Sequence, residues 1–244
     1  MKRVTRTPTG RPRLDPGAAF VTKALIVVNV MVFLANLGQG ASLGSNAGSL
    51  FEDGALFIQR QASDGAIVGL GEGEWWRLIT AAFLHASLIH IGMNMLMLWW
   101  IGAPMEAALG PVRFLAVYLA TGLAGSAGAL LFNPGAVTVG ASGAIFGILG
   151  AALVFERQRT YVLGGSALGI IVLNMIITFT LPNISIGGHL GGLVGGAAAG
   201  LALTRFGRAH AAYGRPGLVG VAGLAAVAIA SFAVSYYQVQ QYVI

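Results

Sequence analysis

Seven long apolar segments, separated by short polar stretches, limit what this 244-residue chain can fold into. Each is close to the roughly 20 residues that a helix needs to cross a bilayer. Backbone groups in lipid must be hydrogen-bonded within their own segment, so all seven are expected to be helices. The predicted spans are Ala18–Leu37, Leu78–Ile101, Phe114–Phe132, Thr138–Phe155, Tyr161–Leu181, Ile184–Leu203 and Leu218–Tyr237.

Charged residues are scarce enough to exclude a soluble globular domain. The chain is 56% hydrophobic and 9% charged, whereas an average soluble protein has about 25% charged residues. The sequence therefore predicts an all-α fold, a polytopic helical bundle in a membrane. The absence of cysteine removes disulfides, thiolate chemistry and Cys-ligated metals.

The basic residues predict the orientation of the bundle. With the N-terminus in the cytoplasm and seven spans, twelve of the 14 Lys and Arg fall on the inner side, and only Arg60 and Arg77 lie outside. This distribution follows the positive-inside rule and puts the C-terminus outside. The net charge of +6 then reflects topology and contact with anionic lipid, and no nucleic-acid partner is expected.

The spans divide the chain into three regions. Residues 1–17 are basic and rich in Pro and Gly, which predicts a disordered cytoplasmic tail. Residues 18–204 form the six-helix core, and residues 205–244 supply a cytoplasmic loop and a seventh helix. The long loop from Gly38 to Arg77 lies outside, and a loop of that length is usually functional or disordered.

Three of the four histidines, His85, His90 and His189, fall within the predicted spans. Ionisable groups inside a bilayer are costly and usually line a cavity or pathway, although each could instead be a packing residue. His90 and Asn94 are four residues apart on one helix and can point at one site. His85 lies about 140° around the same helix from His90 and is expected to face elsewhere.

Ser142 is a single hydroxyl within the small and apolar stretch "VGASGAIFG". It lies about four residues into its span and His189 about five into its own, so both are expected roughly 6 to 8 Å below the same surface. Glycines recur in both segments, in "GASGAIFGILG" and "GGHLGGLVGGAAAG". Such stripes let helix backbones approach closely in lipid, which a Ser to His hydrogen bond would require.

A serine becomes a nucleophile when a base removes its proton, and histidine is the usual base near neutral pH. None of the eight acidic residues lies in the outer half of a span, so a carboxylate is missing and a Ser142–His189 dyad is expected. The backbone N–H of Ser142, the Asn94 amide and the His90 ring are candidate donors to an oxyanion.

These motifs resemble the rhomboid intramembrane serine proteases. The likeness is carried by "GASGAIFG", "HASLIHIGMNMLMLW" and "GGHLGGLVGG", in that family's order along the helices, and by "EAALGPVRFLAVY". The resemblance implies that Ser142 is the nucleophile, that His189 is the base, and that Asn94, His90 and the Ser142 backbone hold the oxyanion. It also implies a six-helix core with an added C-terminal helix.

The same resemblance assigns roles around the site. Gly143 leaves room beside the nucleophile, and Phe146 packs under the imidazole where many family members have Tyr. His85 would be a structural residue, and "EWWR" with Trp76 and Arg77 is similar to the family's Trp-Arg motif in the first outer loop. The implied reaction, without metal or cofactor, is hydrolysis of a peptide bond near the outer end of a transmembrane substrate.

Three alternatives predict different features. A transporter would more often show inverted repeats, interrupted helices or intramembrane carboxylates. A catalytically inactive rhomboid-like protein that binds membrane proteins would keep the glycines and lose Ser142 or His189, and both are present. A zinc protease would need HExxH, which is absent. The charge bias favours the inner (plasma) membrane of a bacterium.

Overall fold

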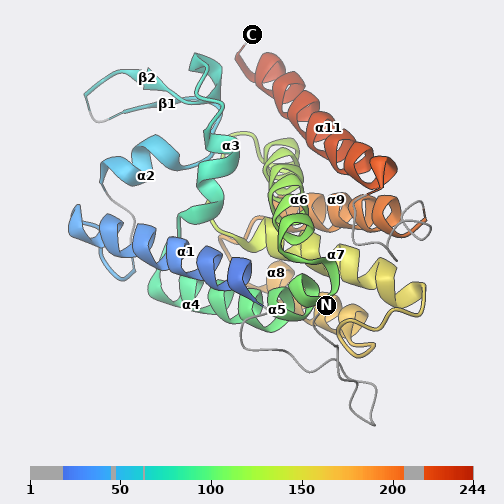
Figure 1. The fold of residues 1–244 in the computed structure, drawn as a ribbon. Coiled ribbons are helices and arrows are strands. Elements are labelled where there is room, and N and C mark those ends of the chain that lie inside the picture. The colour runs from blue at the N-terminus through green and yellow to red at the C-terminus, as the bar shows by residue number, and fades with distance from the viewer. Residues whose placement is uncertain (1–18, 45–47, 63, 206–216, 244) are drawn as a thin grey trace.

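The computed structural model describes residues 19–44, 48–62, 64–205 and 217–243. Within them the chain is a bundle of helices with one small two-stranded hairpin, as Figure 1 shows. The predicted tail of residues 1–17 and the loop of residues 206–216 lie outside the described residues. The prediction of an all-α membrane bundle is confirmed.

Figure 1 labels the α-helices and the two strands, and three short helical segments named η1 to η3 lie between them in the chain. In chain order the elements are α1 (Phe20–Gly38), α2 (Ser49–Gly54), β1 (Arg60–Gln61), β2 (Ile67–Val68), η1 (Leu70–Glu72), α3 (Arg77–Thr80), η2 (Ala81–Phe83), α4 (Leu88–Met97), η3 (Leu98–Gly102), α5 (Ala103–Leu109), α6 (Pro111–Phe132), α7 (Ser142–Arg157), α8 (Ala167–Thr180), α9 (Ile186–Arg205) and α11 (Leu218–Val243).

Among the described residues, five helical stretches are long and apolar enough to cross a membrane. They are α1, the continuous run α4–η3–α5, α6, α9 and α11. The other two predicted spans correspond to shorter helices, α7 with 16 residues and α8 with 14. At 1.5 Å per residue these helices are roughly 24 and 21 Å long, less than a hydrocarbon core of about 30 Å. The middle of α7 is buried among other helices, so little of it would face lipid.

The second predicted span, Leu78–Ile101, is wrong at both ends. The membrane helix runs from Leu88 to Leu109, and the residues before it form the short helices α3 and η2. Ser87 ends this irregular segment, because its Oγ accepts the N–H of His90 at 3.2 Å and caps α4. Gly110, with φ of 79°, separates α5 from α6.

Three further helix boundaries differ from the prediction. Helix α7 begins four residues late, because Thr138 pairs with Leu56 of the long loop in an antiparallel bridge. Helix α8 begins six residues late, after the turns of residues 160–166. Helix α11 continues to Val243, six residues beyond the predicted end.

The loop between α1 and α4 is folded around Arg77, whose side chain is 1% exposed. The guanidinium donates to the carbonyl oxygens of Glu52 and Ala55 and pairs with the carboxylate of Glu74. It also lies 4.3 Å from the centre of the Phe57 ring. The buried charge is thus fully surrounded by acceptors and an aromatic face, which fixes the loop.

Helix α7 is the centre of the bundle, with α6 and α9 packed on it through glycines. A methyl group on Gly196 would overlap the carbonyl oxygen of Gly147, and one on Gly150 would overlap that of Leu193. On α6, a methyl group on Gly125 would lie 2.9 Å from the Cα of Gly143. Small residues therefore allow backbone-to-backbone contact along this interface.

Candidate active site

Ser142 is the first residue of α7, at the end of the helix that faces the long loop. It is half-buried, and the segment before it is held in place by two backbone contacts. Thr138 pairs with Leu56, and the Gly140 N–H donates to the Ala81 carbonyl at 2.9 Å. The loop of the first half of the chain therefore positions the hydroxyl.

The start of α7 and the start of α9 are level with each other. A Cβ on Gly143 would lie 3.4 Å from the carbonyl oxygen of Gly188, and one on Gly192 would overlap the Gly143 carbonyl. Ser142 and His189 are the immediate neighbours of Gly143 and Gly188 in the chain. The glycine contact thus brings the two helices together at the height of these residues.

The His189 ring is held on two sides. It stacks on Phe146 with ring centroids 4.1 Å apart and planes inclined by 17°. Its Nδ1 lies 2.7 Å from the hydroxyl of Thr178 on α8. Among the described residues no hydrogen bond joins Ser142 to His189, and such bonds often form fully only when a substrate is bound.

His90 presents a ring N–H toward the space beside Ser142. Its Nδ1 accepts the Ala86 N–H at 3.2 Å, so the proton of the neutral ring is on Nε2. A methyl group on Gly140 would lie 2.8 Å from that Nε2 and 3.9 Å from the Ser142 Oγ. Both atoms therefore border the small space that Gly140, with φ of 122°, leaves empty.

Asn94 lies one turn after His90 and is buried, with 6% of its surface exposed. Its amide nitrogen donates to the His90 carbonyl at 2.9 Å, and its Oδ1 has no partner among the described residues. One of the two amide hydrogens is thus used within α4, and the other remains available as a donor.

The prediction that His85 lies in a helix and faces away from His90 is wrong. His85 precedes α4, and its ring meets that of His90 edge to face with centroids 5.0 Å apart. The helical angle does not apply because residues 84–87 lie outside any helix. Burial, then the charge of His90, lowers the pKa of His85 to about 3, and a backbone interaction with Phe83 opposes this.

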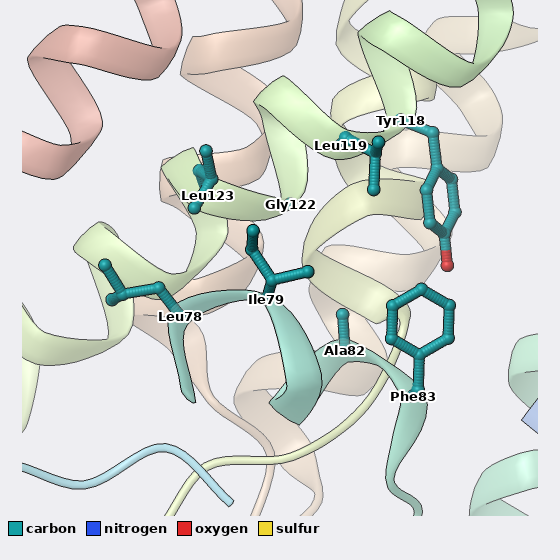
Figure 2. Close-up of a pocket in the computed structure, with 8 residues that line it drawn as sticks. All are labelled: Leu78, Ile79, Ala82, Phe83, Tyr118, Leu119, Gly122 and Leu123. Carbon is teal, nitrogen blue, oxygen red and sulfur yellow. The ribbon is translucent and has the colours of Figure 1, made fainter. Parts of the chain in front are cut away.

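An apolar groove lies next to this region but does not contain Ser142 or His189. Figure 2 shows Leu78, Ile79 and Ala82 facing Leu119 and Leu123 of α6 across it. Its walls are almost entirely hydrocarbon, so it offers no group for chemistry. The reactive groups are instead at the junction of α4, α7, α8 and α9.

The arrangement combines a half-exposed hydroxyl, an imidazole fixed by neighbours and a second imidazole N–H. These are the parts that acyl transfer needs, a nucleophile, a base and an oxyanion donor. Among the described residues, no three His, Asp or Glu side chains gather as metal ligands would.

A family model described as "Rhomboid domain" matches residues 72–206, more than half of the chain. This chain belongs to the rhomboid family. The match covers Ser142, His189, His90 and Asn94. It also shows that the helical bundle is that of an integral membrane protein, as the five long apolar helices indicate.

Rhomboid relatives occur in bacteria and plants. The chain is 42% identical over 144 residues to "Rhomboid protease GluP" of Bacillus subtilis (strain 168), covering 57% of this chain and 28% of that protein. It is 35% identical over 147 residues to "Putative rhomboid protease YdcA" of the same organism, covering 58% and 74%. It is 38% identical over 135 residues to "RHOMBOID-like protein 5" of Arabidopsis thaliana, covering 51% and 43%. The chain thus spans less than two thirds of the first and third of these proteins.

In this rhomboid chain, Trp76 and Arg77 act on the loop and do not reach Ser142 directly. The Trp76 indole N–H donates to the Asp53 carbonyl at 3.0 Å, and Arg77 binds the Ala55 carbonyl at 3.0 Å. Ala55 precedes Leu56, the residue that pairs with Thr138. Both side chains therefore support the strand pairing that precedes α7.

Sequence reasoning missed the roles of two residues of the candidate site. Thr178, which contacts His189, is one of several hydroxyls in the apolar segment of α8, and no motif distinguishes it. The role of Gly140 could have been suspected, because glycine is the residue that readily adopts positive φ where a chain turns into a helix. Its φ of 122° and its contact with His90 give the reason.

Proposed function

We propose that this rhomboid protein is an intramembrane serine endopeptidase that uses Ser142 and His189 as a dyad. The observation that carries the proposal is the way the His189 ring is held beside the start of α7. The ring stacks on Phe146, and its Nδ1 is hydrogen-bonded to Thr178. The names of two bacterial relatives, which include the words "rhomboid protease", support the same function.

In the first half of the proposed reaction, His189 Nε2 takes the proton of Ser142 as Oγ attacks the scissile carbonyl carbon. The carbonyl π electrons move to oxygen, and the resulting oxyanion is bound by His90 Nε2–H, the free Asn94 amide hydrogen and the Ser142 N–H. When the C–N bond breaks, His189 returns the proton to the leaving amine. The acyl group stays on Ser142.

In the second half, a water molecule replaces the amine. His189 removes one proton from the water, the hydroxide adds to the acyl carbon, and the same donors stabilise the second oxyanion. Collapse breaks the bond to Ser142, whose oxygen regains the proton. The role expected for Gly143 is different, because a side chain there would point at the Cα of Gly125 on α6 and the Gly188 carbonyl on α9. This glycine serves the packing of α7 and does not border the space beside the Ser142 hydroxyl.

The substrates proposed for this protein are transmembrane segments cleaved near their outer ends. The Ser142 end of the bundle would face the outside of a bacterial inner membrane, with the N-terminus in the cytoplasm, as the positive-inside rule indicates. Single cysteines at Asp64 and Thr160, both exposed residues, test this with an impermeant thiol reagent. The first should react from outside intact cells and the second should not.

The test of activity is cleavage of a reporter transmembrane substrate in liposomes. We expect Ser142→Ala and His189→Ala each to reduce kcat by roughly 1000-fold or more, while Ser231→Ala, a buried serine of α11, cleaves normally. Normal cleavage by either dyad variant would contradict the mechanism. A wild-type protein that binds the substrate without cleaving it would instead support an inactive rhomboid-like binding protein.

The oxyanion donors are tested separately. Asn94→Ala should lower kcat by roughly 10- to 1000-fold with an unchanged melting temperature. A variant with normal kcat and a lowered melting temperature would show that Asn94 only supports α4.

A further inference from the structure

Thr178 lies between two groups that compete for its single proton. It is 2% exposed, and its Oγ1 lies 2.7 Å from the Asn174 carbonyl oxygen and 2.7 Å from His189 Nδ1. A hydroxyl has one hydrogen to donate and two lone pairs to accept with. If the hydroxyl donates its hydrogen to one of these two groups, it can only accept a hydrogen bond from the other.

The Asn174 carbonyl can only accept a hydrogen bond. If the Thr178 hydroxyl donated to His189, its oxygen would face the carbonyl oxygen at 2.7 Å with no proton between them. If the hydroxyl donates to Asn174, its lone pair accepts an N–H from His189 Nδ1 and both contacts are satisfied. Only in the second arrangement do no two buried acceptor atoms face each other without a hydrogen between them.

The consequence concerns the other nitrogen of the ring. A neutral imidazole with its proton on Nδ1 has a lone pair on Nε2, and that is the atom a base needs. In a serine triad an aspartate holds the histidine in this tautomer and stabilises the imidazolium. Among the described residues no carboxylate contacts His189.

We infer that Thr178 is a positioning residue that holds the proton of His189 on Nδ1 and so leaves Nε2 free to act as the base. The inference rests on the proposed function and assigns part of an aspartate's role to a neutral hydroxyl on α8. The hydroxyl fixes the tautomer and the ring orientation, and Phe146 fixes the ring plane. It supplies no full negative charge, so the imidazolium gains less than it would from a carboxylate.

The chain offers a matched control on the same helix. Thr180 Oγ1 also donates to a carbonyl one turn back, Ile176 at 2.8 Å, and contacts no ring. Thr178→Val removes the hydroxyl and keeps the shape, Thr178→Ser keeps the hydroxyl, and Thr180→Val removes a hydroxyl of the same backbone geometry.

The direct test is the nitrogen-15 spectrum of histidine-labelled full-length protein in bicelles, with His189 assigned by His189→Gln. At a pH where the ring is neutral, the wild type and Thr180→Val should show a protonated Nδ1. Thr178→Val should show the Nε2-protonated form or a mixture. This readout does not depend on cleavage, and the wild-type spectrum alone tests the assignment if the valine variant does not fold.

Kinetics in liposomes supply the second readout. Thr178→Val should lower kcat by about 10- to 100-fold, since bonds to a charged group contribute that much, with KM within about twofold. Thr178→Ser should restore most of kcat. A wild type that cleaves but carries its proton on Nε2, or a valine variant with normal kcat, would overturn the inference alone. A wild type that cleaves nothing would overturn the proposed function, and the inference with it.

Discussion

Helices α8 and α9 both border the central helix α7, but they are held in different ways. Helix α9 meets α7 backbone to backbone, with Gly192 and Gly196 against the carbonyl groups of Gly143 and Gly147. Helix α8 has no such contact, and Gly169 in its first turn has nothing within 4 Å of where a side chain would begin.

Helix α8 is instead tied at its two ends by polar side chains. At its start the Glu156 carboxylate of α7 accepts the N–H groups of Gly165 and Ala167 at 3.0 and 3.1 Å. Near its end Thr178 contacts His189 of α9. Between the ties much of the helix is exposed apolar surface, including Val172, Leu173 and Ile176.

This difference in packing separates the candidate site residues into two groups. Close-packed helices cannot shift by small steps, because each shift overlaps backbone atoms. Helix α8 is held by these hydrogen bonds and by the side-chain packing of Ala167, Ile170 and Ile171, without backbone-to-backbone contact, so its displacement would not force backbone atoms to overlap. The proposed nucleophile and base thus lie on the closely packed pair of helices, and the residue inferred to orient the base lies on the helix tied by hydrogen bonds.

The largest effect should follow from breaking the rigid contact. Gly196→Ala places a methyl group into the Gly147 carbonyl, which should lower the free energy of unfolding by about 3 kcal/mol and abolish cleavage. Gly169→Ala adds the same methyl group to open space on α8. It should leave the cleavage rate unchanged and raise the stability by at most about 1 kcal/mol. An equal loss of stability in both variants would contradict the difference between the two helices. Thermal unfolding followed by tryptophan fluorescence measures both.

A smaller effect should follow from weakening the tie at the start of α8. Glu156→Gln removes the charge that accepts two backbone N–H groups, which should cost about 2 kcal/mol locally. Hydrogen exchange should then accelerate at Gly165 and Ala167 and not in α9. The matched variant is Glu106→Gln, whose carboxylate accepts the N–H groups of Val21 and Thr22 at the start of α1. Its effect on hydrogen exchange should be confined to α1. Faster exchange throughout the protein in both variants would argue against the view that each carboxylate holds only one helix start.

The smallest effect concerns the segment between η2 and α4, outside both helices, where His85 is buried. Its pKa is about 3 in the folded protein against 6.5 ordinarily, so below pH 6.5 the unfolded chain binds a proton that the folded chain does not. Stability should be constant above pH 6.5 from this cause and fall by about 1 kcal/mol between pH 6.5 and 5.5. His85→Phe should make the slope in thermal unfolding shallower by this amount, and an unchanged slope would assign the titration elsewhere.

The sequence allowed the rigid pair to be predicted but not the tied helix. Glycines at four-residue intervals are a local sequence pattern that predicts close packing of helices in lipid, so the close contact of α7 with α9 could be predicted from the sequence. The pairing of Ser142 with His189 was expected from the same pattern and stays a prediction. Thr178 and Thr180 have the same local pattern, and only the packing of α8 against α9 makes one of them a partner of His189.

The errors near His85 have a similar cause. Hydropathy is high on both sides of Leu88, so it could not separate the folded loop from the membrane helix. The signal that could have done so was Ser87 before the run "LIHIGMN", a residue type that favours the cap of a helix. The bridge between Leu56 and Thr138 has no local signal at all, since it joins residues 82 positions apart.

The central claim is that His189 makes Ser142 nucleophilic. Reaction of the full-length protein with a fluorophosphonate, followed by mass spectrometry of its peptides, tests it without any assumption about the substrate. We expect one adduct, on Ser142, with labelling lost in His189→Ala and retained in Ser231→Ala. An adduct on another serine, no adduct at all, or undiminished labelling of Ser142 in His189→Ala would contradict the account.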